Sequence, residues 1–101
     1  MRSRPLGKDQ AKAEINRFLE EGDVIYSKHF REEFASDDLS MQDVLVVCRS
    51  GAISMAPEED IKTGEWKYRI EGFTPDHYRI AVVFTFRSDL AVFITVFKRT
   101  Q

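Results

Sequence analysis

The sequence predicts an α+β domain in which N-terminal helices pack on a four-stranded antiparallel meander sheet. Apolar residues recur at helical spacing up to Gly51, and after it they form runs of strand length. Turn-forming residues separate these later runs, as expected when helices come first and strands follow. A chain of 101 residues with 43% hydrophobic residues can build one core. We therefore expect a flexible tail at 1–8 and a single domain at 9–101.

The first half of the chain carries start and stop signals for helices. Asp9 is a suitable N-cap for a first helix, and Gly22 is well placed to end it. Residues 23–27 are short and partly β-branched, which predicts a short strand or an extended link. Ser27 can then cap a second helix.

A third helix is predicted between Ser40 and Gly51. Ser40 with Asp43 three residues later forms a near capping box. Val44, Val47 and Cys48 follow at helical spacing, so they should form a buried stripe.

The second half predicts strands. Residues 52–56 alternate until Pro57 interrupts them, which indicates an edge strand or a bulge. Residues 65–73 alternate strictly, and 78–86 and 90–97 are mostly apolar. The alternation should place one set of side chains in the core and the other on the opposite face: Trp66, Tyr68 and Ile70 against Lys67, Arg69 and Glu71.

Charge is unevenly distributed along the chain. The formal net charge is −2, but residues 1–61 carry a net −5 and residues 62–101 a net +3. A basic C-terminal part could attract phosphate, although an ordinary solvated surface has a similar composition.

Several classes of protein are not indicated. The chain has no dinucleotide-binding, Walker, HExxH, CxxC or nucleophile-elbow motif, so no cofactor is expected. One Cys and two His are too few for a soft-metal site, and the acidic run Glu58-Glu59-Asp60 is more typical of a solvated loop than of a cation site. The basic N-terminus has no apolar core of a signal peptide, and no window is long enough to span a membrane, which favours a cytoplasmic protein.

Cations on the predicted sheet are the main candidates for function. Lys67, Arg69 and Arg79 should lie on adjacent strands, and the last strand ends in Lys98 and Arg99, with Tyr78 nearby. Such a set suits metal-free cleavage of RNA, which needs proton transfer at the 2′-OH and the leaving oxygen and cations for the developing charge. The competing interpretation is structural, because alternating Lys, Arg and Glu also form cross-strand ion pairs with Glu65 and Glu71.

The histidines and the cysteine are weaker candidates. His29, at the start of the second helix, could transfer protons near neutral pH, although a lone His is more often structural. His77 falls in a predicted turn, and Cys48 is expected to be a buried thiol.

Several strings resemble an uncharacterised family of small bacterial domains often encoded beside a zinc-finger antitoxin of the MqsA type. They are Ser27-Lys28-His29-Phe30, Ser40-Met41-Gln42-Asp43-Val44, Gly64-Glu65-Trp66-Lys67-Tyr68-Arg69-Ile70-Glu71-Gly72 and Ile94-Thr95-Val96-Phe97, with Gly51, Pro57 and Asp60 between them. The resemblance covers about residues 10–98. This family resembles in turn the MqsR toxins, a branch of the RelE-like mRNA interferases.

The resemblance implies a RelE-like fold and a toxin-like, metal-independent endoribonuclease of a type II toxin–antitoxin system. It implies catalytic roles for Lys98, Tyr78 and Lys67. In the same enzyme, His29 would act as an acid or base, and three arginines would bind phosphate: Arg69, Arg79 and Arg99. The implied partners are a cognate antitoxin and mRNA, without direct contact with DNA or membrane. The alternative is a non-catalytic protein-interaction module on the same fold, which the negative total charge favours.

Overall fold

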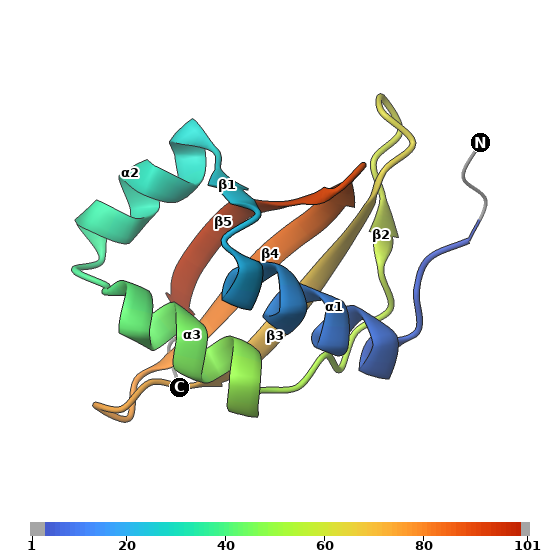
Figure 1. Ribbon diagram of the computed structural model, residues 1–101. Coiled ribbons are helices and arrows are strands. Elements are labelled where there is room, and N and C mark those ends of the chain that lie inside the picture. Colours follow the sequence, from blue (N-terminus) through green and yellow to red (C-terminus); the bar gives the residue numbers. More distant parts are fainter. Residues whose placement is uncertain (1–3, 100–101) are drawn as a thin grey trace.

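A computed structural model describes residues 4–99 as three helices on a five-stranded sheet (Figure 1). The elements are α1 (Lys8–Glu21), β1 (Val24–Tyr26), α2 (Lys28–Ser36), α3 (Met41–Ser50), β2 (Glu58–Glu59), β3 (Trp66–Phe73), β4 (Arg79–Arg87) and β5 (Leu90–Arg99). In the described part of the chain, no helix has the length and apolar character needed to cross a membrane.

The sheet is mixed rather than purely antiparallel. Its strand order is β1-β5-β4-β3-β2, and the expected antiparallel meander runs from β2 to β5. The prediction of four strands is wrong because β1 adds a fifth, parallel to β5, with Ile25 opposite Val92. Such a pairing joins segments almost 70 residues apart, so no local pattern of residues could reveal it.

The first edge strand lies later in the chain than expected. Residues 52–56 contribute only one isolated bridge, between Ala52 and Glu71. The strand at this edge is β2, which consists of Glu58 and Glu59 opposite Lys67 and Trp66. Those two glutamates were expected in a loop, and two exposed acidic residues are a poor local signal for a strand.

Two of the three predicted helix caps are confirmed. The Ser27 side chain accepts from the N–H of Phe30, and Ser40 forms a complete capping box with Asp43. The prediction for Asp9 is wrong: α1 begins at Lys8 with Gly7 as its N-cap, and Asp9 lies in the first turn, where its charge suits the helix dipole. Of the predicted tail, residues 1–3 lie outside the described residues, and Leu6 packs against the core.

All three helices cover one face of the sheet (Figure 1). Tyr68 and Ile70 of β3 are buried with helix residues such as Phe18 and Val47, which confirms the predicted core face of this strand. We call the opposite side, which carries Lys67, Arg69 and Glu71, the open face of the sheet. No described helix covers it.

A β-bulge at Ile94 reverses the alternation within β5. Phe93 pairs with Phe84 and Thr95 pairs with Val83, so Ile94 has no partner in β4. Phe93 and Val96 therefore both face the core although they are three residues apart. As a result, Lys98 follows Val96 on the helix side, whereas Arg99 lies on the open face.

Close backbone approach explains why residue 51 is glycine. A Cβ atom at Gly51 would lie 2.4 Å from the carbonyl oxygen of Glu71 and 2.5 Å from that of Val47. The end of α3 can therefore touch β3 only if this residue has no side chain.

Candidate nucleic-acid site at one end of the sheet

Three arginines meet around one carboxylate on the open face. Arg69 Nε lies 2.8 Å and Arg79 Nη2 2.9 Å from the carboxylate oxygens of Glu71, and Arg99 Nε lies 3.9 Å from it. We call these four residues the arginine cluster. They come together because Arg79 pairs with Phe73 on one side and with Arg99 on the other, at the end of the sheet where β3 finishes.

The cluster has an excess of positive charge that is only partly enclosed. Glu71 is 10% exposed, whereas the side chains of Arg79 and Arg99 are 44% and 41% exposed. Arg69 is more enclosed, and its guanidinium lies 5.1 Å from the ring centre of Phe97. One carboxylate faces three guanidinium groups, so the two outer arginines keep donors that point to solvent.

Tyr78 and Lys98 form a second pair at the same end of the sheet. The Lys98 ammonium lies 4.2 Å from the ring centre of Tyr78, which is half-exposed. Each residue precedes one member of the opposed pair Arg79 and Arg99, so both point to the helix side of the sheet. Tyr78 and Lys98 therefore share an end of the sheet with the arginine cluster, but lie on the other face.

Lys67 lies near the other end of the open face. It lines a hollow of about 360 Å³ together with Asp60, Glu65, Arg87 and Ile94. Arg87 pairs with Glu65 at 2.7 Å, and the hydrogen bonds and charge of Glu65 raise the pKa of Arg87. Lys67 is thus separated from Tyr78 and Lys98 by the length of the sheet.

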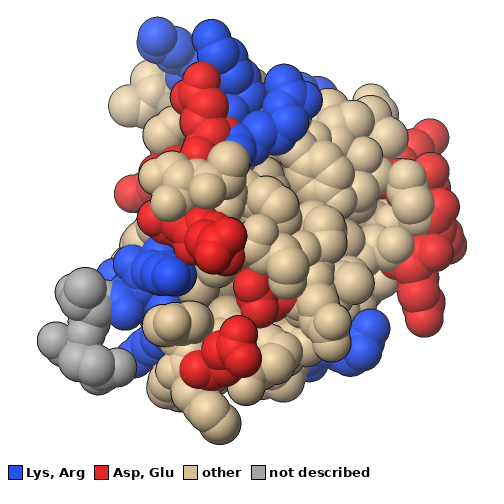
Figure 2. Space-filling model, turned by 90° about the vertical axis from the view of Figure 1, so that its left-hand side faces the viewer, with Lys and Arg blue, Asp and Glu red and all other residues tan. Residues whose placement is uncertain are grey.

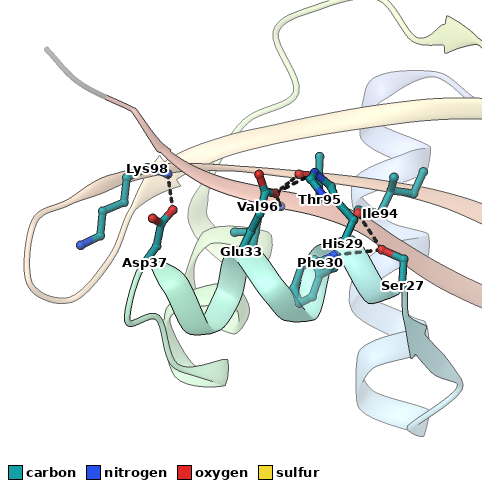
Figure 3. Close-up of polar contacts among 9 residues, drawn as sticks. All are labelled: Ser27, His29, Phe30, Glu33, Asp37, Ile94, Thr95, Val96 and Lys98. Atoms are coloured by element: carbon teal, nitrogen blue, oxygen red, sulfur yellow. Dashed lines mark hydrogen bonds and ion pairs between the residues drawn. The ribbon is translucent and has the colours of Figure 1, made fainter.

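His29 belongs to a polar network between α2 and β5 (Figure 3). Its Nε2 lies 3.4 Å from the Glu33 carboxylate, and its side chain is 63% exposed. The same oxygen of Glu33 accepts from the Thr95 hydroxyl and from the N–H of Val96. The carboxylate stands between the hydroxyl and the imidazole, so His29 is not placed to activate Thr95 as a nucleophile.

Side chains of α2 complete the edge of β5 beyond β1 (Figure 3). Ser27 donates from its hydroxyl to the carbonyl of Ile94, at 2.7 Å, and Asp37 accepts from the N–H of Lys98, at 3.4 Å. With Glu33 between them, these residues occupy backbone groups that a further strand would otherwise bind. This role of Glu33 and Asp37 is not predicted by the sequence, because no residue pattern shows that α2 lies along β5.

Cys48 is confirmed as a buried thiol. Its burial raises its pKa to about 12, so it stays protonated and is a poor nucleophile at neutral pH. His77 lies in the β3–β4 turn with φ 69°, where Thr74 binds the backbone of both His77 and Tyr78.

Basic side chains do not form one continuous surface on the side of the molecule that α2 occupies. In Figure 2, Lys and Arg atoms lie in separate groups with Asp and Glu atoms between them. Over residues 4–99, no three His, Cys, Asp or Glu side chains are grouped so that they could hold a metal ion. In the arginine cluster, by contrast, three cationic side chains lie around a single carboxylate.

Comparison with known proteins identifies the family. No curated protein and no solved structure matches the chain. A family model described as a domain of unknown function, DUF4258, matches residues 26–98, from the end of β1 to the end of β5. This match includes the arginine cluster except for Arg99, and leaves α1 outside. Because it spans most of the chain, the protein belongs to the DUF4258 family.

Proposed function

We propose that this protein is a toxin-like endoribonuclease of the MqsR/RelE-like type, which binds a phosphodiester at the arginine cluster. The observation that carries the proposal is the convergence of three arginines on one carboxylate. The cluster has a formal charge of +2, which matches the two negative charges of a pentacoordinate phosphate formed from a phosphodiester.

The outer arginines would bind the phosphate, and Glu71 would hold their guanidinium groups in position. Arg79 and Arg99 keep exposed nitrogens while each has one nitrogen near Glu71. Arginine suits this task because its donors form a planar fork. Tyr78 and Lys98 lie at the same end of the strands but on the helix side, so they would transfer protons only to an RNA strand that passes around the end of the sheet.

Cleavage by this route uses the ribose as the nucleophile. The 2′-oxygen attacks the adjacent phosphorus and loses its proton, the bond to the 5′-oxygen breaks, and the leaving oxygen gains a proton. The products are a 2′,3′-cyclic phosphate and a free 5′-hydroxyl. An antitoxin protein would be the natural partner of such an activity, and mRNA its substrate.

The test uses a labelled RNA strand and the same strand with 2′-deoxy sugars. Arg79→Gln and Arg99→Gln should each lower cleavage by about 10–100-fold, the effect of losing one charge-assisted hydrogen bond. Arg87→Gln, at the far end of the open face, is the control and should cleave normally. Equal cleavage by all four proteins, or cleavage of the deoxy strand, would refute the proposed site. Expression of Lys98→Ala should also restore the growth that the wild type inhibits.

A non-catalytic interaction module is the second candidate. It is favoured by the ion pairs themselves, since Arg69, Arg79 and Arg87 all have carboxylate partners. In that case Arg79→Gln and Arg99→Gln would change stability or partner binding, and no RNA would be cleaved by any variant.

A further inference from the structure

A cavity of about 350 Å³ lies on the helix side, at the opposite end of the sheet from the arginine cluster. Residues of α1, the start of β3, the end of β4 and the β4–β5 turn line it. Trp66, Tyr68 and Phe86 provide aromatic walls, and Tyr68 and Phe86 are in ring contact at 5.5 Å. A flat, apolar molecule can stack on such walls.

Trp66, which lines the cavity, has a buried hydrogen-bond donor without a partner among the described residues. The indole nitrogen of Trp66 is buried and makes no hydrogen bond to any described group. The oxygen of the neighbouring Tyr68 hydroxyl already accepts from the N–H of Leu6 at 2.9 Å. A buried donor without a partner is unfavourable. A molecule in this cavity is therefore favoured if it presents an acceptor to Trp66.

The rim of the cavity favours a neutral ligand that can also donate. Arg17 is bound by Glu14 at 2.6 Å and by Glu21 at 3.1 Å, so its charge is compensated. Arg4 and Asp89 bring one further charge of each sign. This balance gives no net attraction for a phosphate. Carboxylates, in contrast, accept hydrogen bonds from amino groups on a base edge.

From these features we propose that the cavity binds a nucleobase that carries an exocyclic amino group, either in a free nucleoside or in an RNA strand. The aromatic walls would stack on the base, a ring nitrogen or carbonyl would accept from Trp66, and the amino group would donate to Asp89, because Glu14 is already bound to Arg17. This binding is independent of RNA cleavage, because one nucleoside is sufficient to fill the site.

Trp66 itself is the reporter, since it is the only tryptophan of the chain. Adenosine, guanosine and cytidine should each shift the single indole N–H resonance in a ¹H–¹⁵N spectrum and change Trp66 emission. Uridine should bind more weakly, because its only base donor, the N3–H, lies between two carbonyl oxygens that a carboxylate repels, and a 5′-phosphate should not tighten binding. Tighter binding of a short RNA than of its nucleosides would identify a base within a strand as the ligand. An indole resonance that no nucleoside moves at millimolar concentration would overturn the proposal.

Two aspartates in opposite hairpin turns allow a matched comparison. Asp89→Asn should weaken cytidine binding by about tenfold, the difference between a charged and a neutral acceptor, and should not weaken uridine binding, because an amide can donate to the uracil carbonyl oxygens that the carboxylate repels. Asp76→Asn, in the β3–β4 turn, should change neither. Thermal melting of both variants separates loss of the site from loss of the fold. Equal affinity of Asp89→Asn and wild type for every nucleoside would contradict the assigned rim contact.

Discussion

Replacing Glu71 with glutamine tests whether the arginine cluster stabilises the protein or is kept for a ligand. The change preserves shape but removes the charge that Arg69 and Arg79 share at 2.8 and 2.9 Å. A hydrogen bond to a charged group contributes about 1.5–3 kcal/mol. Because the arginines are a quarter to almost half exposed, solvent screening lowers this value, and we expect a total loss of about 2 kcal/mol.

Urea unfolding followed by Trp66 emission measures this loss directly. A decrease of 2 kcal/mol corresponds to a melting temperature about 8–16 °C lower for a domain of this size. Glu32→Gln removes an exposed carboxylate 4.0 Å from Lys28 and serves as the control, with an expected change within about 0.5 kcal/mol. If the cluster binds phosphate, Glu71→Gln should also bind RNA more tightly, because the formal charge of the cluster rises from +2 to +3, but should cleave it more slowly, because the carboxylate that positions the guanidinium groups is lost. Unchanged stability together with unchanged RNA affinity would refute both parts of this reasoning.

Three further predictions concern stability. Gly51→Ala should cost more than about 3 kcal/mol or prevent folding, because its Cβ would overlap two carbonyl oxygens. Gly7→Ala meets no atom within 4 Å and should cost only about 1 kcal/mol, the loss of a glycine N-cap; circular dichroism melts compare the two variants. Burial raises the pKa of Cys48 from 9.0 in the unfolded chain to about 12 in the fold. The contribution of the buried thiol to the free energy of unfolding is therefore fully present below pH 9. It falls by about 1.4 kcal/mol for each pH unit between pH 9 and pH 12, because the unfolded chain then loses the thiol proton more readily. The stability advantage of wild type over Cys48→Ala should therefore shrink over that range in urea titrations. Ser27→Ala removes a helix cap and a link to β5, and should cost about 1–2 kcal/mol in the same assay, whereas a change below 0.5 kcal/mol would show that water replaces both contacts.

Local patterns predicted the helices and the meander well. Ser27 and Ser40 mark helix starts by a mechanism that acts within a few residues, and strict alternation at 66–71 identifies a strand with one buried face. The parallel pairing of β1 and the short strand β2 depend on tertiary contacts. Neither is encoded in the composition of the segments that form them.

The sequence predicts which residues belong to the candidate site, but not on which face of the sheet each of them lies. Arg69, Arg79 and Arg99 do meet, and the sequence analysis had already named Glu71 as an ion-pair partner. The division of Lys98 and Arg99 between two faces follows from the bulge at Ile94. Nearly every residue of β5 before Lys98 is apolar, so the residue pattern does not reveal the extra residue of the bulge. The sequence therefore could not show which side chains after the bulge face the core and which face away from it.

The position of β5 within the sheet has a consequence for biosynthesis. This segment follows every other element along the chain, yet it lies between β1 and β4 and receives contacts from α2. While a ribosome is still making residues 90–99, β1 has no strand to pair with and α2 has no strand to pack against. The contacts of β1 and α2 with the sheet should therefore form only after that stretch has emerged, in one late step of folding.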